Sequence, residues 1–548
     1  MTTIDPKVAA GPTVASADRT TGASTSVSDW LTTSDHKKIG RLFMGSSLAL
    51  ALAVAALGAL LGFERLDAES TSLDVDALPQ LFSLFRIVLT FGVVTPFLLG
   101  LAIAVVPLQV GARALAFPRL AAAGFWTWLI GAGLVVGSIA ANGGPSGGNS
   151  DMVDLFLASH VLVVIGLVAA AIAVAASVLT TRAPGMNMRR VPLFSWSALV
   201  SSLGLILMLP VLAGALVLLY LDHRGPRTTF GGNLGVGSWI DFAFTQPATF
   251  VYALPAFGIA ADVIATSTRR RLKLRGVALT GLGLIGAATF AGVSQVDAPI
   301  RPDVRDLSFG QVVNDVLPYA LFNLLPILGA LVVLAVGLLA LASGRPRINS
   351  PLLFAFFGVF HIVVGMLGNA VYQIGDARLA GTVFEEGAWI YVMYGALLAG
   401  LGGVTYWGPK LWGRTIGDVK AIPLAMLGAL AVALASLPHY IAGFAKQPAG
   451  ATEFDYSGPQ EIWNGAVMIG HVLMAVTLLA FIGLALASFT KGKLAGDDPW
   501  DGQTLEWATA SPAPTHNFAE VHSVASAEPL LDLKPTAAAG SGTAGGKA

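Results

Sequence analysis

The chain has 548 residues, of which 55% are hydrophobic and only 12% are charged. Soluble proteins carry about 25% charged residues, so this composition predicts a membrane protein that crosses the bilayer many times. The formal net charge of zero gives no reason to expect nucleic acid as a partner. The lack of cysteine excludes disulfides, thiolate metal sites and iron-sulfur clusters, and leaves eight histidines as strong metal ligands.

Apolar runs separated by short polar breaks fill the middle of the chain. Each run is long enough to cross a hydrocarbon layer of about 30 Å. We therefore predict an all-α, polytopic membrane protein with twelve transmembrane helices. The runs lie at residues 39–63, 82–107, 122–141, 154–179, 193–222, 239–268, 276–295, 313–343, 351–373, 383–408, 421–445 and 463–490.

The predicted membrane domain covers residues 31–495 and is followed by a cytoplasmic segment at 496–523. Residues 1–30 are rich in Thr, Ser, Ala and Gly and residues 524–548 are similar, so we expect two disordered tails and no cleavable secretory signal. Basic residues gather in alternate loops, as in the run beginning at Arg269, and most acids lie in the other loops. This asymmetry predicts that both termini are cytoplasmic.

Seven stretches of the chain match the motifs of one known family. They are Leu81–Pro96, Val106–Leu120, Thr245–Gly258, Gly292–Asp297, Gly381–Gly395, Gln447–Gly450 and Gly496–Phe518. Together they resemble subunit I of the haem-copper oxidases, the cytochrome c and quinol oxidases. The resemblance covers residues 30–518 and implies the twelve-helix arrangement of that subunit, with 496–523 as its cytoplasmic tail.

The resemblance also implies that the iron ligands are missing. The family's helix that matches Gly381–Gly395 carries two haem-binding histidines, and Ala388 and Ile390 stand in their places. Phe85 stands at the position of a third haem ligand, and Ala114 replaces the carboxylate that opens the family's main proton channel. Alanine, isoleucine and phenylalanine offer no lone pair to iron.

The copper and propionate positions are replaced as well. Gln246 stands in the place of one copper ligand, and Ser294 and Gln295 stand in the places of the adjacent copper histidines. A glutamine amide is a poor ligand for copper, which prefers imidazole and soft donors. Ala449 and Gly450 replace the paired arginines that hold the haem propionates in the family. We therefore predict no haem, copper or other cofactor.

Four histidines remain inside the predicted membrane domain, each on a different helix. A lone histidine in a transmembrane helix is more often a hydrogen-bonded residue of the bundle than a metal ligand, although a relocated haem held by two of the four stays open. We expect the other histidines outside the bilayer, with His223 in an outer loop. The four histidines inside the predicted membrane domain are His160, His361, His439 and His471.

Four ionisable residues are candidates for charges inside the bundle. Unpaired charges are costly to bury, so intramembrane ions usually have partners. Arg86 follows one replaced ligand, and Glu385 and Glu386 precede the others, so we predict that Arg86 pairs with one of these acids. Alternatively, both acids lie in water at the interface. Asp262 is expected to cap or pair with the basic loop that begins at Arg269.

The same reasoning predicts what fills the space of the absent haem. We expect bulky apolar side chains, such as Phe85, Trp389 and Ile390, to occupy much of that volume.

Three functions are compatible with these residues, and conventional oxygen reduction is not one of them. The first is a non-catalytic scaffold or partner subunit of a membrane complex such as a respiratory one. The second is a redox or quinone-linked subunit with relocated ligands, and the third is a carrier of a small molecule or ion through the vacated haem cavity. The expected partners are the lipid bilayer and other membrane subunits, and the expected location is the bacterial cytoplasmic (inner) membrane.

Overall fold

The computed structural model describes residues 27–67, 72–74, 77–225, 229–295, 308–455, 459–520 and 523–533. The chain divides into two compact units, Met1–Thr33 and Ser34–Ala548. In the first unit the described residues contain the short helix α1 (Val27–Leu31). Most of the predicted tails, 1–30 and 524–548, lies outside the described residues. All elements below belong to the second unit.

Within the described residues, 12 helical spans are long and apolar enough to cross a membrane, which confirms the predicted all-α, polytopic membrane fold. The bounds differ from the predicted ones by only a few residues. The spans are α2 (His36–Glu64), α3 to α4 (Leu78–Gln109), α5 (Pro118–Ala140), α6 (Ser150–Thr180), α7 (Leu193–Arg224), α8 to α9 (Gly235–Thr268), α10 to α11 (Arg275–Ser294), η5 to α14 (Val312–Ser343), α15 (Ser350–Tyr372), α16 (Phe384–Trp412), α17 (Asp418–Phe444) and α18 (Gln460–Lys491).

Four of these spans are built from shorter pieces. The first consists of α3 (Leu78–Ile87), the π-helix η2 (Val88–Val94) and α4 (Thr95–Gln109). The π turn comes just before Pro96, whose ring and missing N–H prevent a regular helical hydrogen bond there. The other pieces are α8 (Gly232–Ile240), η3 (Asp241–Ala243), α9 (Ala248–Thr268), α10 (Arg275–Ile285), η4 (Gly286–Ala288), α11 (Thr289–Ser294), η5 (Val312–Val316), α13 (Leu317–Tyr319), η6 (Ala320–Leu324) and α14 (Leu325–Ser343).

Short elements connect or follow the spans. They are the hairpin of β1 (Gly143–Gly144) and β2 (Gly147–Gly148), the pair of β3 (Arg414–Thr415) and β4 (Lys493–Leu494), α12 (Phe309–Gln311), η7 (Gly375–Ala377), η8 (Leu505–Ala508) and α19 (Pro529–Leu533).

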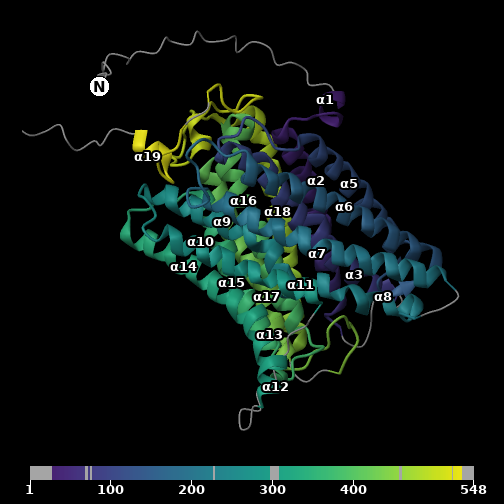
Figure 1. The fold of residues 1–548 in the computed structure, drawn as a ribbon. Helices are drawn as coiled ribbons and strands as arrows, with labels where there is room; N and C mark the ends of the chain where they lie inside the picture. Colours follow the sequence, from purple (N-terminus) through teal and green to yellow (C-terminus); the bar gives the residue numbers. More distant parts are fainter. Residues whose placement is uncertain are drawn as a thin grey trace, which may run out of the picture. The chain divides into compact units, whose positions relative to one another are not determined.

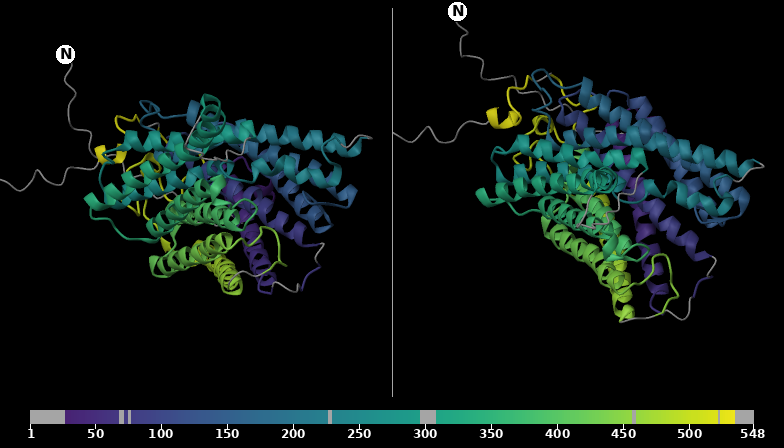
Figure 2. Two further views of the ribbon diagram at one scale, coloured as in Figure 1. Left: turned by 90° about the horizontal axis from the view of Figure 1, so that it is seen from below. Right: turned by 60° about the horizontal axis from the view of Figure 1, so that its bottom comes forward.

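The core of the bundle is formed by α4 and α16, whose most apolar stretches are completely buried. Helix α16 packs against α15, α17 and α9, and these helices lie side by side in Figures 1 and 2. Its crossing with α15 is so close that a Cβ atom at Gly395 would lie only 2.7 Å from the carbonyl oxygen of Gly358. Small residues at such a crossing allow two membrane helices to approach closely.

The segment that follows α18 packs over the C-terminal end of α16 (Figure 1, yellow). Trp500 Nε1 donates to the carbonyl oxygen of Tyr406 at 2.8 Å, and Trp507 Nε1 donates to the Tyr406 hydroxyl at 3.1 Å. Part of the expected tail from residue 524 packs against the loop between α6 and α7 and against the C-terminal segment. The Val524 amide donates to the Pro184 carbonyl at 2.9 Å, and the amide of the buried Leu530 donates to the Gln503 carbonyl at 3.2 Å. Tail composition alone did not indicate these two apolar anchors.

Candidate functional site

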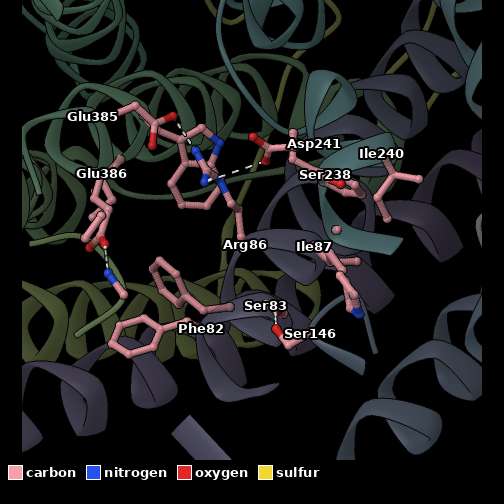
Figure 3. A pocket seen from close by; sticks show the side chains of 18 residues that line it. Phe82, Ser83, Arg86, Ile87, Ser146, Ser238, Ile240, Asp241, Glu385 and Glu386 are labelled. Atoms are coloured by element: carbon pink, nitrogen blue, oxygen red, sulfur yellow. Dashed lines mark hydrogen bonds and ion pairs between the residues drawn. The ribbon is translucent and has the colours of Figure 1, made fainter. Parts of the chain in front are cut away.

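Two cavities lie at the N-terminal end of α16, opposite the C-terminal segment. The first, here called the aromatic cavity, has a volume of about 420 Å³ and is shown in Figure 3. It is lined by Phe82, Ser83, Phe85, Arg86, Ile87, Pro145, Ser146, Gly237, Ser238, Ile240, Asp241, Phe244, Glu385, Glu386, Trp389, Ile390, Ala449 and Gly450.

The second cavity, here called the polar cavity, has a volume of about 750 Å³. Its lining includes Thr245, Gln246, Asn369, Gln373 and Asp376, so hydrogen-bonding side chains dominate it. The two cavities share three lining residues, here called the ion cluster. These are Arg86 from α3, Asp241 from η3 and Glu385 from α16.

The ion cluster is built around the guanidinium group of Arg86 (Figure 3). Arg86 Nη2 donates to Glu385 Oε1, and Nη1 lies 4.0 Å from Asp241 Oδ1. The guanidinium also lies over the Trp389 ring, 5.6 Å from its centroid. The side chain of Glu385 is 11% exposed and that of Asp241 is 54% exposed. Arg86 therefore pairs with Glu385 inside the bundle, and Asp241 lies where solvent reaches the cluster. The alternative prediction, that both Glu385 and Glu386 lie in water at the interface, is therefore wrong for Glu385.

Glu386 turns away from Arg86 and binds Arg65, the residue that directly follows α2. The pair is bidentate, with Arg65 Nη1 2.8 Å from Glu386 Oε2 and Nη2 3.0 Å from Oε1. The Gly450 amide also donates to Glu386 Oε1 at 2.9 Å, and the Arg65 guanidinium lies 4.6 Å from the centroid of the Phe82 ring. Neighbouring helical residues point about 100° apart, which explains why the adjacent acids have different partners.

The predicted iron-ligand positions lie in or beside the aromatic cavity. Phe85 and Ile390 line it, whereas Ala388 is buried and does not. The Phe85 ring packs edge-on against Trp389 and His471, with centroid distances of 5.7 and 5.4 Å. These aromatic side chains occupy space next to the cavity without filling it.

The predicted copper positions do not come together around either cavity. Gln246 lines the polar cavity and is 2% exposed, and neither its amide oxygen nor its amide nitrogen has a hydrogen-bond partner. Ser294 is the last residue of α11 and Gln295 follows it. Both are exposed, and neither lines the aromatic or the polar cavity. The propionate positions Ala449 and Gly450 line the aromatic cavity.

The four membrane histidines lie on α6, α15, α17 and α18. His361 Nδ1 lies 2.8 Å from the Phe357 carbonyl oxygen, and His471 Nδ1 lies 2.9 Å from the Tyr394 hydroxyl. His160 packs among phenylalanine rings, and His439 is buried. No group of three or more His, Cys, Asp or Glu residues is arranged to hold a metal ion in the part of the chain that the structure describes.

The prediction for His223 was wrong, because this residue lies in the last turn of α7 and not in a loop. Its Nδ1 atom lies 2.7 Å from Asp154 Oδ1 on α6. The helix continues past the apolar run because Asp222, His223 and Arg224 all find partners on or near it.

Asp262 has a different partner from the predicted one. Its Oδ1 and Oδ2 atoms accept from the amides of Leu193 and Phe194, each at 3.1 Å, so it caps the N-terminus of α7 rather than the loop at Arg269. The first amides of a helix have no intrahelical acceptor, and a carboxylate satisfies them. This contact joins residues far apart in the chain, so local sequence did not reveal it.

A second buried acid, Glu506, lies close to Asp262. Gln109 Nε2 donates to Asp262 Oδ2 at 2.9 Å and to Glu506 Oε1 at 3.1 Å, and Trp407 Nε1 also donates to Glu506 Oε1 at 3.1 Å. Burial, with the nearby Asp262 carboxylate as a second cause, raises the pKa of Glu506 to about 7. The C-terminal segment therefore packs against the bundle through a buried carboxyl group whose pKa is raised toward neutral pH.

Sequence reasoning missed Arg65, Asp241 and Glu506. Arg65 directly follows Glu64 at the end of an apolar run, and Asp241 lies inside a span whose other residues are mostly apolar. A search for every charge within a few residues of a predicted helix end would have found both. Glu506 lies in the segment that follows the last span, and no local pattern indicates its burial.

These observations define a polytopic membrane protein whose bundle encloses paired cavities beside an ion cluster. The sequence pattern of the family described as "Cytochrome C and Quinol oxidase polypeptide I" matches residues 38–473, and the chain belongs to this family.

Relatives and a solved structure agree with this assignment. Cytochrome c oxidase subunit 1 of Bacillus subtilis is 27% identical, over 92% of this chain and 82% of its own length. Cytochrome c oxidase subunit 1 of Alkalihalophilus pseudofirmus is also 27% identical, with the same coverage of 92% and 82%. A chain of a haem-copper terminal oxidase dimer has the same fold, with a TM-score of 0.60 and 14% identity over 83% of this chain and 85% of that one.

Proposed function

We propose that the chain is a non-catalytic homologue of haem-copper oxidase subunit I, which acts as an integral scaffold or partner subunit of a membrane complex without haem or copper. It lies in the cytoplasmic membrane of a bacterium, with both termini in the cytoplasm. Its family consists of oxidase subunits that assemble with other subunits, and a respiratory complex is the expected setting. The proposal rests on the family resemblance, which aligns Phe85, Ala388 and Ile390 with the iron-ligand positions.

The residues around the aromatic cavity do not fit a haem. A haem iron needs a nitrogen, sulfur or oxygen ligand, and the replaced positions offer only carbon atoms. Haem propionates need cations, but the Arg65 guanidinium is already paired with the Glu386 carboxylate, which also accepts a hydrogen bond from the Gly450 amide. A propionate placed beside Glu386 would meet a like charge. Both the iron end and the propionate end of the site therefore argue against the cofactor.

The second candidate, a redox subunit with relocated ligands, has less support. His160, His361, His439 and His471 lie on four different helices. His361 already has a hydrogen-bond contact with the Phe357 carbonyl, and His471 has one with the Tyr394 hydroxyl. A metal bound to the same nitrogen atoms would displace these partners. His160 lies among phenylalanine rings.

The third candidate, a carrier, is favoured by one observation. The aromatic and polar cavities, of about 420 and 750 Å³, are large enough for small molecules and share the ion cluster. A scaffold subunit does not need such cavities. This candidate is compatible with a scaffold role, because a subunit can both bind a ligand and hold a complex together.

The proposal is tested on the full chain purified in mild detergent. A pyridine haemochrome spectrum and elemental analysis measure haem, iron and copper per chain, with the Bacillus subtilis relative purified in the same way as the positive control. We expect haem and copper far below stoichiometric amounts. Stoichiometric haem bound to this polypeptide would overturn the proposal.

A pull-down from solubilised membranes separates the scaffold from a free carrier. Mass spectrometry of the purified material should find other membrane subunits in constant ratio to this chain. If the chain comes out alone under conditions in which the relative keeps its own subunits, the scaffold role fails and the carrier is favoured.

A further inference from the structure

We propose that the aromatic cavity binds a small organic ammonium compound, with its apolar ring inside the cavity and its charged nitrogen at Asp241. The inference rests on the proposed function, because a haem in the same place would fill the cavity. It goes further by naming the chemical class of the ligand and the carboxylate that recognises it.

The shape and lining of the aromatic cavity favour a ring. Aromatic side chains line it from three elements: Phe82 and Phe85 from α3, Trp389 from α16, and Phe244 beside η3. Isoleucine side chains complete the apolar wall, as Figure 3 shows for Ile87 and Ile240. Ligand sites are typically apolar concavities of this kind with a few polar groups that fix orientation.

The charges around the cavity favour a cation. Arg86 is paired with Glu385, and Arg65 is paired with Glu386, so each arginine neutralises one acid. Asp241 is left with only a 4.0 Å approach to Arg86, at the limit of an ion pair, and its side chain is 54% exposed. An anion would have to displace Glu385 from Arg86, whereas an ammonium group at Asp241 competes only with the long contact between Asp241 and Arg86.

The aromatic rings support the same preference. A cation within about 6 Å of a ring centroid is attracted by the ring face. Arg86 already lies over Trp389 and Arg65 over Phe82, at 5.6 and 4.6 Å from the centroids, so the aromatic wall of this cavity already accommodates positive charge in two cation–π contacts with the chain's own arginines. The apolar walls and the partly exposed Asp241 carboxylate thus favour a positive charge attached to an apolar body.

The polar cavity extends the site beyond Asp241. Gln246 is 2% exposed, lines this cavity, and has no hydrogen-bond partner at either amide atom. A buried amide without a partner is costly, and a bound molecule or water that donates and accepts would satisfy it. A polar substituent on the nitrogen side of the ligand would point toward this amide. The class is therefore an amphipathic ammonium compound.

The test uses three probes with the same ring and different charge: phenethylammonium, phenethyl alcohol and phenylacetate. Isothermal titration calorimetry on the full chain in a neutral detergent at low salt measures their affinities. We expect phenethylammonium to bind about tenfold more tightly than the other two, a value typical of one partly exposed charge pair together with a cation–π contact. Equal binding of the three probes, tighter binding of phenylacetate, or no binding of any of them would overturn the proposal.

Two matched variants locate the charge that matters. Asp241→Asn should remove most of the preference for phenethylammonium. Asp151→Asn removes the same charge from an exposed residue that lines neither cavity, and it should leave the affinities within about twofold of the wild type. A preference that survives Asp241→Asn, or that is lost equally in Asp151→Asn, would refute the assignment. A thermal unfolding curve for each variant shows that it is folded.

The haem content of the same sample distinguishes the two possible failures. If the absorbance spectrum shows stoichiometric haem, the proposed function fails and the cavity is not free for a ligand. If haem is absent and the ammonium preference is also absent, only the present inference fails.

Discussion

The ion pair between Arg65 and Glu386 gives the sharpest test of how the site is held together. The Arg65 side chain is 4% exposed, and its two terminal nitrogens lie 2.8 and 3.0 Å from the Glu386 carboxylate, whose side chain is 20% exposed. Replacing Glu386 with Leu leaves the guanidinium with one carbonyl contact, from its Nε to the Ala451 oxygen at 3.1 Å, and the face of Phe82. The buried arginine would then carry a charge without a counter-ion.

The expected cost follows from that orphaned charge. Removing one partner of a buried ion pair costs about 3 to 5 kcal/mol, and the partial exposure of Glu386 lowers the value to about 2 to 3 kcal/mol. Replacing both partners, as in Arg65→Met with Glu386→Leu, removes the charge along with its partner. The double variant should therefore be more stable than the sum of the two single losses predicts, by about 2 kcal/mol.

Equilibrium unfolding in mixed micelles, followed by tryptophan fluorescence, measures these differences for the wild type, both single variants and the double variant. The control is Asp151→Asn, whose exposed side chain should change stability by no more than about 0.5 kcal/mol. A Glu386→Leu variant as stable as the wild type, or strict additivity in the double variant, would refute the reasoning that this pair holds α2 and α16 together.

Three further predictions concern other parts of the chain. Burial raises the pKa of Glu506 from 4.5 to about 7, so the native state binds this proton more tightly than the unfolded chain does. Stability should fall by about 3 kcal/mol as pH rises from 4.5 through 7, and unfolding curves of Glu506→Gln across this range should lack that fall. Asp262→Ala should destabilise the protein by about 1 to 2 kcal/mol in the same assay, because the first amides of α7 lose their acceptor; an unchanged midpoint would contradict the capping role. Phe85→His combined with Ile390→His introduces imidazoles at two of the predicted iron-ligand positions, but a pyridine haemochrome assay should still find no stoichiometric haem, since the Glu386 carboxylate still accepts from the Gly450 amide and pairs with Arg65. Haem uptake by that variant would show that the axial ligands alone decide cofactor binding.

The fold could be predicted from the sequence because a membrane imposes a simple constraint. Each spanning helix needs about 20 predominantly apolar residues, and polar breaks between such runs are visible without any knowledge of packing. The internal irregularity of the spans was not visible. The π-helix η2 (Val88–Val94) lies within an unbroken apolar run, and only Pro96 signals that regular helical bonding cannot continue there.

The candidate site could be predicted only in part. The approach of Arg86 to Glu385 was predicted from their places beside two positions that the family resemblance aligns with haem ligands. The partners of Glu386 and Asp262 did not follow, since Arg65 and the amides of α7 become neighbours only through tertiary packing. Such contacts depend on which helix ends meet in the folded bundle, and the hydropathy of the sequence does not indicate this.

The charges at the N-terminal end of α16 form a set whose members depend on each other. Arg86 lies partly inside the bundle because Glu385 neutralises it, and Arg65 is buried because Glu386 does the same. Removing Glu386 alone would leave the buried Arg65 cation without a counter-ion, at a cost of several kcal/mol. Removing Glu385 would leave Arg86, which is 27% exposed, with only its long contact to Asp241. Asp241 differs because solvent already reaches it and its contact with Arg86 is long. It is therefore the charge of the cluster that can change partners at the lowest cost, and this is why we expect ligand recognition to depend on Asp241 and stability to depend on Glu386.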